Sequence, residues 1–98
     1  MKVVSNVVTV RPLDNVILLD VAVYKDTDKA QEHPIRIEVA TDAELYVERA
    51  RFIGPEYEKM DVGEVTDDQM QAYKTAKDHI ERHLDAIKRE AMQFKPGL

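Results

Sequence analysis

The 98-residue chain contains no cysteine, and this absence removes several kinds of site at once. Without a thiol there is no disulfide framework, no thiol nucleophile, and no zinc ribbon or iron–sulfur cluster. Glycine is scarce, with three residues, and neither phosphate-binding motif, GxGxxG or GxxxxGK[ST], occurs. The GxSxG motif of serine hydrolases is also absent, and Ser5 is the only serine. We therefore expect a protein that is not an enzyme and that needs no cofactor.

Long apolar runs are lacking as well. The longest aliphatic stretch is the four residues 16–19, whereas a membrane-spanning helix needs about 20 apolar residues. The N-terminal sequence also reaches polar residues too early for the apolar core of a signal peptide. The sequence therefore predicts no membrane segment, and we expect the protein to be cytoplasmic.

Positive charge is in the minority, with 14 basic residues against 19 acidic ones and a net charge of −5. Proteins that bind nucleic acids usually have a basic stripe, because neutralising phosphates supplies most of their affinity. In this chain the basic residues are scattered, and nearly every one has an acidic residue close by in the sequence. The sequence therefore predicts no direct binding to nucleic acid, and mild acidity is typical of ordinary soluble proteins.

The first 41 residues have the pattern of three strands. Residues 3–11 are rich in valine and threonine but alternate imperfectly, which indicates a β-bulge or burial on both faces. Residues 16–25 place four aliphatic side chains on one face, and residues 35–39 alternate aliphatic with charged side chains. Because no crossover helix separates these strands, we expect an antiparallel meander over residues 1–41.

Two capping-box sequences then predict helices. The Thr-Asp-Ala-Glu sequence at 41–44 predicts a short helix that ends at Gly54 and Pro55, a typical helix-stop pair. The Thr-Asp-Asp-Gln sequence at 66–69 predicts a long helix that continues to about Phe94. The expected fold is a single α+β domain over residues 1–98, with the helical part at 42–98. It consists of a three-stranded, mostly antiparallel sheet, a short helix and a long C-terminal amphipathic helix.

The long helix carries the most informative pattern. Its seam residues recur alternately three and four positions apart, which is a heptad pattern. A helix of about 28 residues would be about 42 Å long, and a ten-residue strand only about 33 Å. We therefore expect part of the seam to contact the chain's own sheet and part to contact another chain, giving a homo-oligomer. The predicted interface residues are Met70, Tyr73, Lys77, Ile80, Leu84, Ile87 and Phe94.

These features predict a protein-interaction or assembly module that self-associates through its long helix, has protein partners and has no small-molecule substrate. Its small size and lack of catalytic motifs would suit an accessory or structural protein of a virus or mobile element. An alternative prediction is an acidic inhibitor of a host or nucleic-acid-binding protein, because residues 56–68 hold six acidic residues interleaved with apolar ones. The residues predicted to bind in that case are Glu56, Tyr57, Glu58, Asp61 and Glu64.

His79 and His83 lie one helical turn apart, the spacing at which two imidazoles can share a metal ion. The H-E-x-x-H motif is absent, and His33 is the only other histidine. The sequence therefore predicts no metal site.

Overall fold

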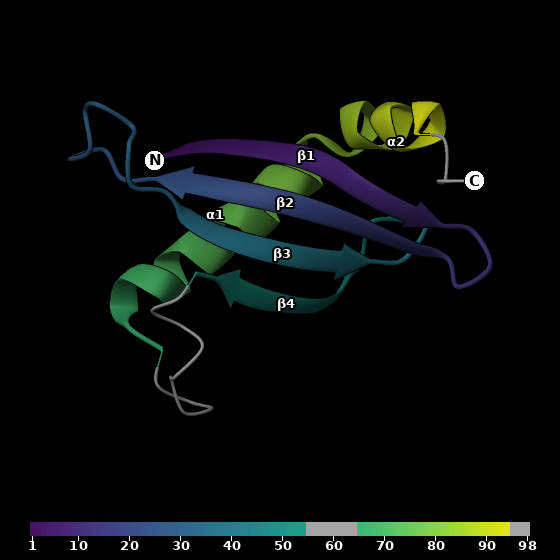
Figure 1. Cartoon of the computed structure of the whole chain (residues 1–98), viewed down its shortest axis with the longest axis horizontal. Helices are drawn as coiled ribbons and strands as arrows, with labels where there is room; N and C mark the ends of the chain where they lie inside the picture. Colours follow the sequence, from purple (N-terminus) through teal and green to yellow (C-terminus); the bar gives the residue numbers. More distant parts are fainter. Residues whose placement is uncertain (55–64, 95–98) are drawn as a thin grey trace.

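The computed structural model describes residues 1–54 and 65–94, in which four strands are followed by two helices. The elements are β1 (Lys2–Arg11), β2 (Val16–Tyr24), β3 (Ile35–Thr41), β4 (Val47–Ile53), α1 (Asp67–Arg82) and α2 (Leu84–Gln93). All neighbouring strands are antiparallel and lie in chain order. Helix α1 crosses one face of the sheet, and α2 lies beside β1 (Figure 1). The predicted α+β class is confirmed.

The short helix predicted from residue 41 to residue 54 is wrong, because this region forms a tight turn and strand β4. The Asp42 carboxylate accepts hydrogen bonds from the backbone N–H groups of Glu44 (2.9 Å) and Tyr46 (3.0 Å). Leu45 has a positive φ of 65° and is buried. A short acidic side chain can satisfy the donors of a turn as well as those of a helix start. The sheet therefore has four strands rather than three, and the strand region extends past residue 41 to Ile53.

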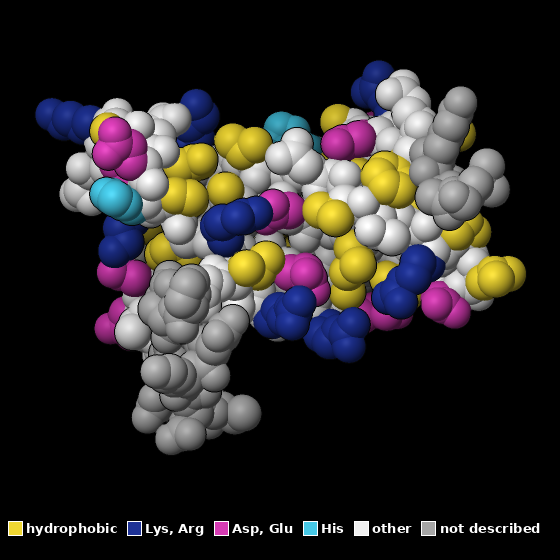
Figure 2. Space-filling model, viewed as in Figure 1, with side chains coloured by type: hydrophobic (Ala, Val, Ile, Leu, Met, Phe, Trp, Pro, Cys, Tyr) yellow, Lys and Arg dark blue, Asp and Glu magenta, His cyan; other side chains and the backbone are white. Residues whose placement is uncertain are grey.

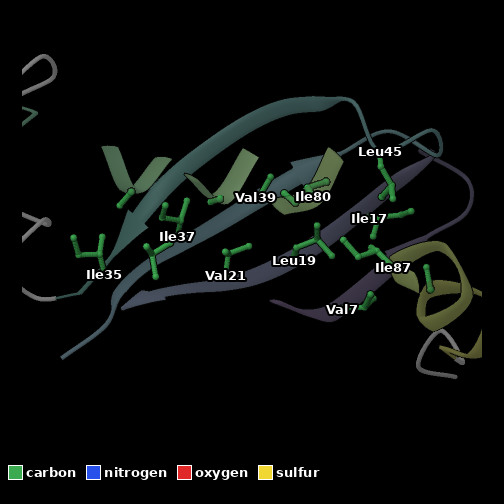
Figure 3. Close-up of a cluster of buried hydrophobic side chains, with 14 residues drawn as sticks. Val7, Ile17, Leu19, Val21, Ile35, Ile37, Val39, Leu45, Ile80 and Ile87 are labelled. Carbon is green, nitrogen blue, oxygen red and sulfur yellow. The ribbon is translucent and has the colours of Figure 1, made fainter. Parts of the chain in front are cut away.

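The predicted apolar faces of β2 and β3 form the centre of the core. Opposite strands place these side chains side by side, so that Leu19 lies between Val7 and Val39. A register shift between Val7 and Thr9 confirms the predicted irregularity in β1, with Val8 as the extra residue. Figure 3 shows the cluster, to which the helices add Ile80 and Ile87.

The capping box at the start of α1 is confirmed. The Thr66 hydroxyl accepts a hydrogen bond from the Gln69 N–H (3.2 Å), and the Gln69 side chain accepts one from the Thr66 N–H (2.8 Å). The buried face of α1 differs from the predicted seam, since Ala72 and Ala76 lie against the sheet at 0% and 1% exposure. Small side chains at these positions let the helix approach the strands closely. Met70, a predicted seam residue, is 46% exposed.

The single long helix predicted from residue 66 to residue 94 is also wrong, because it is broken at His83. The backbone there leaves the helical region (φ −118°, ψ 29°). Helix α2 then turns toward β1, buries Ile87, and places the Glu90 carboxylate 3.1 Å from the Val7 N–H, which donates to it. No glycine or proline lies at the break. These contacts with β1 favour the turn between the two helices.

Candidate functional site

The structure divides the seven predicted interface residues into two groups. Ile80 and Ile87 are 0% and 3% exposed and belong to the protein's own core (Figure 3), so they are not available to a second chain. The other five keep exposed or partly exposed side chains: Met70, Tyr73, Lys77, Leu84 and Phe94. Only this second group can contribute to an interface of the folded protein.

Two of these residues line a groove of about 380 Å³ between the helices and the β3–β4 turn. We call it the α1 groove, and its lining residues are Glu44, Leu45, Tyr46, Val47, Lys77, Glu81, Leu84 and Lys88. Leu45 is buried and Leu84 half-buried, so they form its apolar base. Tyr46 stands at the rim with 73% of its surface exposed. The groove thus offers an apolar base with an exposed aromatic side chain next to it.

The charged side chains of the α1 groove are balanced, with two lysines and two glutamates. The Lys88 ammonium forms an ion pair with the Glu44 carboxylate, at an N–O distance of 3.2 Å. Within the part of the chain that the structure describes, Lys77 and Glu81 form no ion pair. The α1 groove therefore has no net charge from its lining side chains, and one lysine and one glutamate in it have no ion-pair partner among the described residues.

The other face of the sheet has no helix over it among the described residues, and Figures 1 and 2 view the molecule from this side. We call it the open face. Its side chains alternate with those of the core and are therefore assigned by the strand register. The side chains on the open face include those of Val4, Leu18, Asp20, Ala22, Arg36, Glu38, Arg49 and Arg51.

Ion pairs cross the open face from strand to strand. Arg36 pairs with Asp20, and the Nε of Arg51 lies 3.1 Å from a carboxylate oxygen of Glu38. Arg49 has no ion pair with any other residue that the structure describes. Among the described residues of β3 and β4, the open face therefore presents the unpaired Arg49 guanidinium and two guanidinium groups that are paired with carboxylates.

His79 and His83 lie at the C-terminal end of α1, with His79 next to β1. The rings of His79 and His83 lie with their centroids 4.4 Å apart, and the Ser5 hydroxyl is 3.2 Å from the Nε2 of His79. Partial burial, and secondarily the charge of His83, lower the pKa of His79. His33 lies in the β2–β3 loop, where its backbone N–H donates to Asp28 (2.9 Å). Over residues 1–54 and 65–94, no three His, Asp or Glu side chains form a cluster that could hold a metal ion.

The predicted acidic site cannot be placed, because Glu56, Tyr57, Glu58, Asp61 and Glu64 lie outside the described residues. Sequence reasoning also missed two surfaces. The helix predicted from residue 41 includes the residues of the β3–β4 turn, so nothing in the sequence indicated that Tyr46 and Glu44 line a groove. The Arg49 and Arg51 pair was hidden in the same way, although its alternation with Ala50 and Phe52 is the signal of a strand with one buried face.

No protein-family model, no curated protein and no solved structure matches this chain. None of the helices in the described ranges is long and apolar enough to span a bilayer.

Proposed function

We propose that the protein is a non-enzymatic protein-interaction module of the cytoplasm, whose partners are proteins and which self-associates through the α1 groove. The supporting observation is that the heptad residues left over from the core, Lys77 and Leu84, line a groove next to the exposed Tyr46. Exposed aromatic side chains beside apolar hollows are typical of protein interfaces. The balanced charge of the groove favours a second copy of the chain as the occupant.

A twofold contact explains these features together. In such a contact the same surface is used by both copies, so that each Tyr46 enters the groove of the other copy and packs on its Leu84. Lys77 of one copy then lies opposite Glu81 of the other, and both unpaired charges acquire partners. The contact closes on itself, which gives a dimer rather than a filament.

The substitution Tyr46→Ala tests this contact. Burying a large apolar side chain contributes about 1.5–3 kcal/mol, and each 1.4 kcal/mol changes a dissociation constant about tenfold. We therefore expect the dissociation constant of the dimer, measured by sedimentation equilibrium, to rise at least about tenfold. Because Tyr46 is 73% exposed in the single chain, its thermal stability at low concentration should change little. Leu13→Ala, at a residue that is 100% exposed in the β1–β2 turn, is the matched control.

A charge exchange tests the opposed pair in the same assay. Lys77→Glu and Glu81→Lys should each weaken the dimer, since each places like charges opposite one another, and the double variant should restore it. Association that is unchanged in both Tyr46→Ala and Lys77→Glu would remove the α1 groove as the interface.

A further inference from the structure

We infer that the open face is a second binding site, which takes an acidic protein segment that also carries apolar side chains. This site is separate from the α1 groove, because α1 packs on the opposite face of the sheet (Figure 1). It uses residues of all four strands and none of the helices.

Strands β1 and β2 contribute apolar side chains to the open face. Val4 is 40% exposed and lies opposite Ala22 in the strand register, while Leu18 is half-buried on the neighbouring part of β2. Figure 2 shows hydrophobic side chains distributed over this face between the charged ones. Apolar side chains that remain accessible on a sheet face mark a surface that can bind a partner.

The open face is positively charged although the protein is acidic. The paired positions of the strands place five cationic side chains on it and two carboxylates, those of Asp20 and Glu38. The cationic residues are Lys2, Arg11, Arg36, Arg49 and Arg51. The net charge of the open face remains positive when Glu48, the extra residue at the β4 register shift, is also counted. The chain as a whole has a charge of −5, so this face has the opposite sign to the rest of the molecule.

The arginines are arranged so that they can still bind carboxylates. Two N–H groups of Arg51 donate to Glu38, at 3.1 and 3.3 Å, and Arg36 donates to Asp20. A guanidinium has five N–H donors, so each paired arginine retains donors for another acceptor. Arg49 has no counter-charge in the described part of the chain. The three side chains offer donors for acidic groups on β3 and β4, next to the apolar side chains of β1 and β2.

Two other occupants fit the open face less well. A nucleic acid needs a continuous row of cationic groups along its phosphates, whereas Asp20 and Glu38 interrupt the cationic groups of the open face. The strands also contribute one aromatic side chain to this face, Tyr24, which leaves little surface for stacking bases. A second copy of the same face would bring two positive surfaces together.

Fluorescence anisotropy with a labelled peptide tests this inference. The probe is a synthetic peptide with the sequence of residues 56–65, which combines four carboxylates and one lysine with apolar side chains. We expect saturable binding to the intact protein that weakens as salt is added. The double variant Arg49→Glu, Arg51→Glu should bind at least about tenfold more weakly, because two attractive charge contacts become repulsive.

Matched controls separate a local effect from a change in net charge. The double variant Lys29→Glu, Lys74→Glu has the same net charge as the arginine variant, but its exposed lysines lie in the β2–β3 loop and on α1. It should bind the peptide within about twofold of the wild type once salt screens long-range effects. Val4→Ser should weaken binding, whereas Met92→Ser, at a residue that is 85% exposed on α2, should not.

Several results would overturn the inference. The first is that the peptide does not bind at millimolar concentration, and the second is that the wild type and the arginine variant bind it equally. The third is that a single-stranded oligonucleotide binds more tightly than the peptide at the same salt concentration. Loss of self-association in the arginine variant would instead make the open face an interface between copies, which also contradicts the inference. Peptide binding should persist in Tyr46→Ala, so this test is independent of the α1 groove.

Discussion

Replacing Ile80 with alanine tests the packing of α1 on the sheet. Ile80 is 0% exposed and joins the core formed by β2 and β3 (Figure 3). The substitution removes buried apolar atoms and leaves a cavity, which together destabilise a protein by about 2–5 kcal/mol. A domain of this size is stable by only about 5–15 kcal/mol. A loss of about 3 kcal/mol is therefore a large fraction of its total stability.

The free energy of unfolding is measured by urea denaturation followed by circular dichroism. We expect the midpoint to fall while the dependence on urea stays the same, because the folded structure is retained. A loss of about 3 kcal/mol should also lower the melting temperature by about 12–24 °C.

The matched control is Met70→Ala on the same helix. Met70 is 46% exposed and belongs to the heptad seam predicted from the sequence. We expect this variant to lose less than about 1 kcal/mol, as is usual for partly exposed positions. If Met70→Ala destabilises the protein as much as Ile80→Ala, then α1 packs with the predicted seam toward the sheet. That result would refute the orientation described above.

Two further predictions concern the N-terminal cap of α1 and His79. Thr66→Ala removes the hydroxyl of the capping box and should reduce the free energy of unfolding by about 1 kcal/mol; Thr66→Ser should retain it, and equal stabilities of the two variants in urea would contradict the role of the hydroxyl. The pKa of His79 is lowered from 6.5 in the folded protein, so the unfolded chain binds a proton more readily. The contribution of the neutral His79 to the free energy of unfolding is therefore fully present above pH 6.5 and is lost as the pH falls below it. His79→Gln should make the melting temperature depend less on pH between about 5 and 7.5. An unchanged dependence would show that the pKa of His79 is the same in the folded and unfolded chain.

The first three strands could be predicted because their pattern is local. A strand with one buried face shows alternation in its own sequence, and Ile35, Ile37 and Val39 alternate with Arg36 and Glu38. The irregular valine pattern of β1 indicated a bulge for the same reason. A short turn at 12–15 joins β1 to β2, and a loop without a helix at 25–34 joins β2 to β3, so their antiparallel order needed no information about distant contacts.

Strand β4 could not be predicted from the capping signal, because that signal has two structural meanings. The side chain of Asp42 accepts hydrogen bonds from nearby backbone N–H groups in either a turn or a helix start. The residues after it decide between the two. Val47, Ala50 and Phe52 face the core only if the chain is extended, and their partners on β3 become available only once the sheet has formed.

The helical region shows the limits of heptad reasoning. The large residues of the seam predicted its buried face only in part, because Ala72 and Ala76 contact the sheet more closely than Met70 or Lys77. No proline or glycine lies at the break at His83, so the sequence does not indicate it. It follows from contacts that α2 makes with β1, above all Ile87 in the core and Glu90 on Val7. The α1 groove depends on these long-range contacts, because Leu84 and Lys88 in its lining lie on α2.

The molar mass of the unmodified protein in solution is the most direct test of self-association through the α1 groove. Light scattering across a dilution series into the high micromolar range compares the measured mass with the 11.3 kDa of a single chain. A closed twofold contact predicts a mass that rises with concentration to twice this value and then stays constant. A mass of 11.3 kDa at every concentration would contradict the proposed function.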